Sequence, residues 1–149
     1  MKEAIGTSMV FNLIMIFVGI MIAILIGSIS YSKGFKIRNR IIDRIEEYEG
    51  YDTKSGVISE IDEDLKAIGY KVVKVIDDDK CKERNGQKSL TSTYSGGYNY
   101  CVYQYKTSEG YYYGVTVFIS FDIPLIGNYI EIPIYGETRV IFDKGTVEG

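Results

Sequence analysis

Few side chains in this sequence have the type and spacing that chemistry requires. The chain contains no histidine, which removes the commonest general base, the Ser-His and Cys-His nucleophile pairs and imidazole zinc sites. The acidic segment Glu60–Asp64 lacks the calcium-loop pattern with its terminal glutamate, so we expect a solvated helix face. Gly96-Gly97 lacks the rest of a phosphate-binding loop. We therefore expect no enzyme, no metal, no cofactor and no small-molecule substrate.

The two cysteines are the remaining reactive pair. Cys81 and Cys101 are too far apart in the sequence for a C-x-x-C redox or metal motif. In an oxidising compartment they can form a disulfide that closes a loop of about 20 residues. In a reducing compartment they are free thiols, one exposed and one buried. We favour the disulfide, on the condition that this part of the chain lies outside the cytoplasm.

A long apolar run stands before all of these residues. Met9–Ile29 contains 21 residues without a charge, and the uncharged run extends from Ala4 to Ser32. A helix of that length spans roughly 30 Å, the thickness of a bilayer's hydrocarbon core. The run is longer than the apolar part of a signal peptide and lacks a small-x-small cleavage site. We predict that residues 1–33 form an N-terminal tail and a transmembrane helix whose partner is membrane lipid; the alternative is a buried core helix.

Charge is distributed unevenly along the chain. Residues 1–44 carry six Lys or Arg and two Asp or Glu, whereas the remainder carries eleven and eighteen. An acidic domain argues against nucleic acid as a partner. The basic residues that follow the apolar run are expected to reach lipid headgroups, and by the positive-inside rule they place the domain in the cytoplasm. Composition and the cysteines favour the opposite side. The basic residues are Lys33, Lys36, Arg38, Arg40 and Arg44.

Helical periodicity continues beyond the apolar run. Residues 34–50 are predicted to form an amphipathic extension of the helix, with an apolar stripe whose residues recur every three or four positions. We expect this extension to bend at Gly34 and to end near Gly50. A second, shorter helix begins at Val57 and ends before Gly69. The stripe of the extension consists of Phe35, Ile37, Ile41, Ile42, Ile45 and Tyr48, and that of the second helix of Val57, Ile58, Ile61, Leu65 and Ile68.

From residue 70 onward the period changes to two, which is typical of strands. Pro133 removes one ladder donor and predicts an edge, a bulge or a strand end. Asn85-Gly86 is a tight-turn pair without the alternating flanks of a hairpin. The predicted strands are Tyr70–Ile76, Tyr98–Tyr105, Tyr111–Phe121, Tyr129–Ile134 and Thr138–Phe142, with turns at Thr107–Gly110 and Pro124–Asn128.

These elements predict an α+β fold with a four- to five-stranded, mainly antiparallel meander sheet. Residues 51–149 form one small head domain, and the apolar stripes of the two helices are the surface available to cover its sheet. The long helix is then both a stalk and the spine of the head, in the shape of a lollipop.

Two sets of residues are candidates for contact with other proteins. The first has small or polar side chains on the transmembrane helix, with Gly19, Ala23 and Gly27 at four-residue spacing, which permits close helix packing or arises by chance. Its members are Asn12, Gly19, Ala23 and Gly27. The second is a group of strand tyrosines, interpreted equally well as half-buried sheet residues or as a contact surface. They are Tyr98, Tyr100, Tyr103, Tyr111 and Tyr113.

The layout resembles the type IV pilin superfamily, and within it the TadE-like pseudopilins of tight-adherence (Tad) pili. The residues that carry the resemblance are Ile5–Phe11, the amphipathic extension, and the sheet segments Phe121–Ile126 and Tyr135–Thr138. The resemblance implies a pilin-like lollipop fold and a leader-peptidase site at Gly6 and Thr7. The fifth residue after Gly6 is Phe11, where the family has glutamate, and this departure suits a minor subunit better than a major pilin.

What the resemblance implies for function is a minor subunit or assembly factor of a type IV or Tad-type pilus or secretion system. Its partners would be other pilin-like subunits or membrane assembly proteins. It would be a single-pass protein of the cytoplasmic membrane with an extracytoplasmic head. The alternative is a bitopic membrane protein whose head is a binding or sensor domain unrelated to pili.

Overall fold

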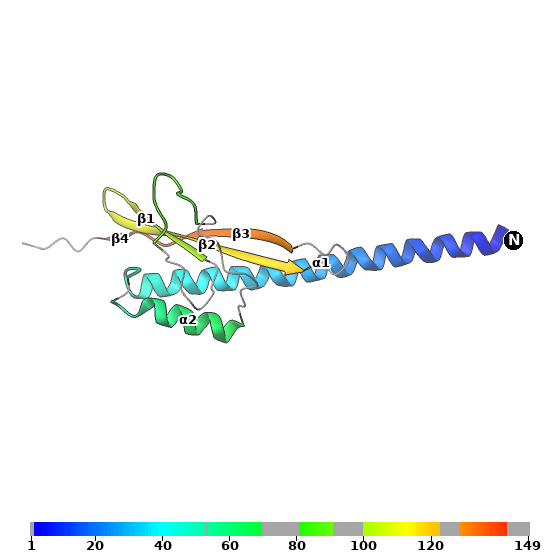
Figure 1. Ribbon diagram of the computed structural model, residues 1–149, viewed down its shortest axis with the longest axis horizontal. Helices are drawn as coiled ribbons and strands as arrows, with labels where there is room; N and C mark the ends of the chain where they lie inside the picture. The colour runs from blue at the N-terminus through cyan, green and yellow to red at the C-terminus, as the bar shows by residue number, and fades with distance from the viewer. Residues whose placement is uncertain (1, 53, 70–80, 91–99, 123–128, 143–149) are drawn as a thin grey trace, which may run out of the picture.

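The computed structural model describes residues 2–52, 54–69, 81–90, 100–122 and 129–142 (Figure 1). Within these residues, two helices are followed by a four-stranded antiparallel sheet. This confirms the α+β fold with a long N-terminal apolar helix, a short second helix and about four strands. The elements are α1 Lys2–Glu47, α2 Val57–Ile68, β1 Tyr100–Lys106, β2 Gly110–Asp122, β3 Tyr129–Glu137 and β4 Ile141–Phe142.

The helix α1 continues from the apolar run into the head (Figure 1). It passes through Gly34 without a break; the glycine instead allows close packing, because a Cβ there would lie 2.8 Å from the Ile134 Cδ1 atom and closer still to Ile119. The helix ends with Glu49 in the left-handed conformation at φ 50°, and the Gly50 amide donates to the Ile45 carbonyl at 3.0 Å. That 6→1 hydrogen bond closes the last turn near the predicted end.

The short helix α2 has the predicted bounds. Gly56 precedes it and Gly69 follows it, both in the left-handed conformation, and the Gly69 amide donates to the Lys66 carbonyl at 2.9 Å. Its acidic N-terminal half lies at the positive end of the helix dipole. The apolar residues at helical spacing are buried: Val57, Ile58, Ile61 and Leu65.

The sheet is built around β2. On one side β2 pairs with β1, from Tyr100↔Val117 to Lys106↔Tyr111; on the other it pairs with β3 and then with β4. The predicted meander therefore holds for β1, β2 and β3, while β4 returns to β2 in line with β3. The predicted strand Thr138–Phe142 is too long, because only Ile141 and Phe142 pair.

Thr138 fills the interruption between β3 and β4. Its amide donates to the Tyr113 carbonyl, and its Oγ1 accepts from the Tyr113 amide, both at 2.9 Å. A threonine side chain thus replaces one ladder hydrogen bond, which satisfies backbone groups that would otherwise be buried without partners.

One hydrophobic core unites the sheet and both helices. In Figure 1, α1 lies between α2 and the sheet. The stripe Ile37, Ile41 and Ile45 on α1 is almost completely buried, and it packs in the same cluster as residues of α2, β1 and β2. Burial of each such side chain contributes roughly 1.5–3 kcal/mol. The C-terminal half of α1 is therefore part of the head's core.

The remaining local predictions have mixed outcomes. Pro133 lies in β3, an edge strand of the described sheet, as expected. Asn85 and Gly86 form a tight turn with positive φ, in which Arg84 and Gln87 exchange two hydrogen bonds of 3.0 Å without flanking strands. The predicted strand Tyr70–Ile76 and the predicted turn Pro124–Asn128 lie outside the described residues.

Candidate functional site

The N-terminal half of α1 exposes its apolar side chains on all sides. Leu13 is 67% exposed, Phe17 63% and Ile29 69%, although the same helix buries Ile37 and Ile41 further on. Monomeric soluble proteins rarely expose an apolar surface of this extent. The helix is long and apolar enough to cross a membrane, and its apolar part is not buried inside the molecule. This surface is the main candidate site.

The predicted helix-packing residues all lie on this exposed half. Asn12 and Ala23 are exposed, and Gly19 and Gly27 are partly exposed. A Cβ built at either glycine would meet nothing within 4 Å, so the backbone there is open to close approach by a second helix. Their role in packing stays a prediction. Gly6 and Thr7 lie near the start of α1, and their processing is likewise untested.

Three of the five strand tyrosines are buried, which for these three favours the alternative of sheet residues over that of a contact surface. Tyr100 is 2% exposed, and Tyr103 and Tyr113 are each 4% exposed. Tyr100 and Tyr113 face the helices, whereas Tyr103 lies on the opposite face. The physical reason is that both faces of the sheet are covered. Tyr111 is half-buried, and its hydroxyl donates to the Glu49 carbonyl at 3.2 Å.

Tyr98, the fifth predicted contact residue, lies outside the described residues.

The cover on the outer face of the sheet is the segment 81–90, held by a disulfide. Cys81 and Cys101 are bonded, with Cα atoms 5.5 Å apart, and Cys101 is fully buried. The Tyr103 hydroxyl donates to the Lys82 carbonyl at 2.7 Å, and the Arg84 guanidinium lies 3.9 Å from the centroid of the Tyr135 ring. Of the two states expected for the cysteines, free thiols or a disulfide, the structure contains the disulfide, which holds the segment 81–90 against the sheet.

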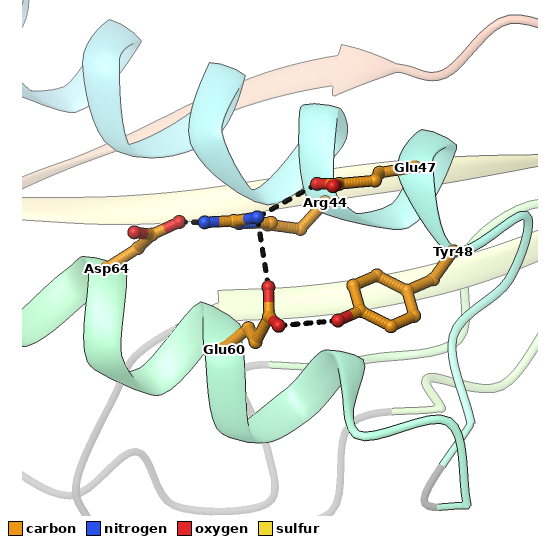
Figure 2. Close-up of polar contacts among 5 residues, drawn as sticks. All are labelled: Arg44, Glu47, Tyr48, Glu60 and Asp64. Atoms are coloured by element: carbon orange, nitrogen blue, oxygen red, sulfur yellow. Dashed lines mark hydrogen bonds and ion pairs between the residues drawn. The ribbon is translucent and has the colours of Figure 1, made fainter.

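A charged cluster that was not predicted from the sequence lies between α1 and α2 (Figure 2). Arg44 forms ion pairs with Glu47 at 2.8 Å, Glu60 at 2.9 Å and Asp64 at 2.8 Å. The Tyr48 hydroxyl donates to Glu60 at 2.5 Å. The hydrogen bond from Arg44 lowers the pKa of Asp64, and the hydrogen bond to Glu60 raises the pKa of Tyr48. The cluster therefore joins the two helices electrostatically.

This cluster corrects two expectations. Glu60 and Asp64 are partly buried and paired with Arg44. The helix face that carries these two carboxylates therefore packs against α1 and is not the solvated face that was expected. Arg44 contacts carboxylates of the head instead of lipid. The only signal in the sequence was the four-residue spacing of Glu60 and Asp64, which puts both on one helix face. Their partner Arg44, sixteen to twenty residues earlier in the chain, could not be deduced from that spacing.

Two observations on the described residues concern metal and small-molecule binding. Among them, no group of three or more His, Cys, Asp or Glu could hold a metal ion. An open groove of about 230 Å³ lies between the end of α1 and β4, lined by Glu46, Arg139 and Phe142 among others. Glu46 and Arg139 pair across it at 3.5 Å, so the guanidinium of Arg139 already has a carboxylate partner.

Comparison with known proteins does not assign the chain. No family model matches it, and no curated protein or solved structure does. The class that the described residues define is an α+β protein whose N-terminal helix is long and apolar enough to span a membrane.

Proposed function

We propose that this protein is a membrane-anchored, pilin-like (TadE-like) minor subunit or assembly factor of a type IV or Tad-type pilus or secretion system. The observation that supports this most is the division of α1 into two parts. Its N-terminal half is apolar and exposed, and its C-terminal half is the buried spine of a small antiparallel sheet. The resemblance to the type IV pilin superfamily depends on the same organisation.

In this proposal α1 acts by helix–helix packing within the membrane. Without a hydrophobic driving force in lipid, helices associate where small residues let their backbones approach. Gly19 and Gly27 supply such positions, since neither has a neighbour within 4 Å of a Cβ. The head follows the helix rigidly because Ile37, Ile41 and Ile45 join it to the sheet. Other pilin-like subunits or membrane assembly proteins are the partners.

The head is proposed to lie outside the cytoplasm. The disulfide between Cys81 and Cys101 favours an oxidising compartment. The basic flank favours the opposite side, but two of its members have roles in the head. Arg44 binds three carboxylates, and Arg38 donates to the Tyr135 carbonyl at 3.0 Å. The positive charges of Arg44 and Arg38 therefore stabilise the fold of the head, in addition to any effect on the orientation of the helix in the membrane.

The basic flank supports a second candidate, a bitopic protein with a binding or sensor head in the cytoplasm. Alkaline phosphatase and a fluorescent protein fused in turn after Gly149 separate the two. We expect phosphatase activity only, because that enzyme needs an oxidising compartment. Fluorescence without phosphatase activity would remove the pilin-like function and leave the second candidate.

Partner identity is tested by cross-linking the tagged chain in its native membrane. We expect pilin-like subunits or membrane assembly proteins among the products, and a loss of these products in Gly19→Leu, because the larger side chain blocks close approach. Ile20→Leu, one residue along the same helix, is the matched control and should retain them. Equal cross-linking by both variants would contradict packing through Gly19.

A further inference from the structure

The strands β1 and β3 flank β2 in the described sheet, and each has a free edge. In an antiparallel ladder the backbone groups of alternate residues point toward the neighbouring strand, and those of the other residues point away from it. The Thr107 amide donates to the Gly110 carbonyl at 2.7 Å, which closes the β1–β2 hairpin and fixes this alternation. The residues of β1 whose backbone groups point outward are therefore Tyr100, Val102, Gln104 and Lys106.

The edge of β3 is protected against a further strand. The outward carbonyl of Tyr135 accepts a hydrogen bond from the Arg38 guanidinium at 3.0 Å. Pro133 lies two residues earlier and therefore faces the same edge, where it has no amide hydrogen to donate. Proteins protect the edges of their sheets in such ways against unwanted pairing.

The edge of β1 is protected over its N-terminal half only. There the segment 81–90 lies against the strand, and the Leu90 amide donates to the outward carbonyl of Val102 at 2.7 Å. Further along the strand, the outward backbone groups of Gln104 and Lys106 have no hydrogen-bond partner among the described residues. The C-terminal half of β1 is therefore an open edge.

A groove follows this open edge. Its volume is about 670 Å³, within the usual range of ligand-binding clefts. Its lining consists of Gln87 on the segment 81–90, the strand residues Gln104 and Lys106, and the hairpin residues 107–111. A polypeptide in the groove therefore lies beside the two residues whose outward backbone groups are unpaired.

The open edge also carries positive charge. Lys88 and Lys106 are exposed, and among the described residues neither forms an ion pair. The groove lining contains one carboxylate, that of Glu109 in the turn. A lysine on a strand edge discourages pairing with a like-charged strand, so Lys106 disfavours pairing with the same edge of a second copy. An acidic strand is favoured instead.

This edge lies at the end of the head remote from the apolar half of α1. The Tyr111 hydroxyl donates to the Glu49 carbonyl, just after α1 ends, whereas Ile119 at the other end of β2 contacts Gly34. In Figure 1 the β1–β2 turn and the N-terminus of α1 lie at opposite ends. A partner can therefore reach the edge without contacting a bilayer that surrounds the apolar half.

We propose that the open edge of β1 is a docking site for an extended, acidic segment of another protein, which adds to the sheet as a further strand. The backbones of Gln104 and Lys106 supply the hydrogen bonds, as in other cases of β-strand addition. The ammonium groups of Lys88 and Lys106 pair with carboxylates of the added strand. The inference goes beyond the proposed function and does not depend on the membrane anchor.

The test measures binding of a fluorescent peptide to the full-length chain in nanodiscs of zwitterionic lipid. The probe is a short peptide in which glutamate and threonine alternate, because threonine favours strands and alternation places the carboxylates on one face. Fluorescence anisotropy reports the binding. The same peptide with methylated amide nitrogens, which cannot donate to a strand edge, is the control.

We expect the wild type to bind the probe and not the methylated control. Gln104→Pro removes only an outward amide hydrogen, which an edge strand tolerates, and should weaken binding about tenfold, the effect of one hydrogen bond. Lys106→Glu changes an exposed side chain, should weaken binding as well, and keeps the test valid if Gln104→Pro does not fold. Lys82→Glu, an equal change of charge at another exposed position, should have no effect.

Three results would overturn the proposal. The first is binding of the methylated control as tight as that of the probe, and the second is equal weakening by Lys82→Glu and Lys106→Glu. The third is a wild type that does not bind the probe. Hydrogen exchange of the Gln104 amide then identifies another occupant. Protection at every protein concentration indicates the chain's own predicted strand Tyr70–Ile76, and protection that rises with concentration indicates a second copy.

Discussion

At Gly34 the backbone of α1 contacts the side chains of Ile119 and Ile134 directly. The glycine does not serve as a hinge, because the helix continues through it. Its value lies in the missing side chain, which lets the sheet approach the helix at the point where the head meets the apolar run. A single methyl group at this position would occupy the same space as Ile119.

We expect Gly34→Ala to destabilise the head by about 1–3 kcal/mol, the usual cost of overpacking a core. Chemical denaturation of the full-length chain in detergent measures this change. Gly27→Ala is the control, because a Cβ there meets nothing within 4 Å. Ile119→Val removes the Cδ1 atom, the nearest of the atoms that the added Cβ would meet, and should restore part of the stability in the double variant. Equal stability of Gly34→Ala and the wild type would contradict the close contact.

Arg44 is the residue that joins α1 to α2 by charge. It pairs with Glu60 and Asp64 on α2 and with Glu47 on its own helix. Its hydrogen bond lowers the pKa of Asp64. A carboxyl group with a lowered pKa in the folded state stabilises the fold above its unfolded pKa, which is about 3.9, and loses this contribution as the pH falls through the folded value.

Arg44→Met should therefore lower the Tm at neutral pH, and the difference from the wild type should shrink as the pH falls below about 4. Thermal unfolding in detergent across this pH range measures both effects. Lys36→Met removes a positive charge from an exposed position of the same helix and should change the Tm little at any pH. A Tm difference for Arg44→Met that is constant with pH would show that lost packing, not charge, is responsible.

Among the elements, the segment 81–90 has the least regular structure and a clear structural role. It covers the face of the sheet opposite α1, where Cys101, Tyr103 and Tyr105 form a second small core. The Leu90 amide donates to the Val102 carbonyl at 2.7 Å, so the far end of the segment is attached to β1 as well. The disulfide and this hydrogen bond hold the segment in place.

Replacement of both cysteines by alanine should cost about 3 kcal/mol of stability, the chain-entropy estimate for a closed loop of this size. Denaturation of the oxidised wild type and of the double variant measures the difference. Reducing agent should bring the wild type down to the stability of the variant and leave the variant unchanged. Unaltered stability of the reduced wild type would mean that the disulfide does not hold the segment.

Sequence periodicity predicted the elements that bury one side only. Ile37, Ile41 and Ile45 are buried as their spacing required, and Val115 and Val117 face the helices as alternation required. The pattern also predicted the N-terminal half of α1, because an unbroken apolar run has no polar face that could point to water while the other face is buried.

The tyrosines and the charged cluster could not be predicted in this way. Alternation correctly places Tyr103 on the sheet face opposite the helices, yet its side chain is buried because the segment 81–90 covers it. No local sequence pattern shows where a polar loop folds back onto a sheet. The pairing of Arg44 with Asp64 depends on α2 packing antiparallel to α1, a contact between segments separated by a turn. Thr138 in the β3–β4 interruption is a similar case, because its side chain replaces a backbone group.

In the whole molecule, α1 connects an exposed apolar segment that is able to span a membrane to a folded head, without an intervening linker. Its N-terminal half exposes apolar side chains, and its C-terminal half lies in the core of the head. Any force or displacement on the N-terminal half of the helix is therefore transmitted to the sheet. This is the property that the proposed role in a pilus-type assembly requires.

Amide hydrogen exchange of the full-length chain in lipid nanodiscs tests this dual role of α1 most directly. We expect Met9–Ile29 to exchange extremely slowly, since water is excluded from a helix in lipid, and residues 35–47 to exchange at the rate of β2, because they unfold as one cooperative unit. Rapid exchange of Met9–Ile29, as in a helix exposed to water, or exchange of residues 35–47 much faster than that of β2, would contradict the account.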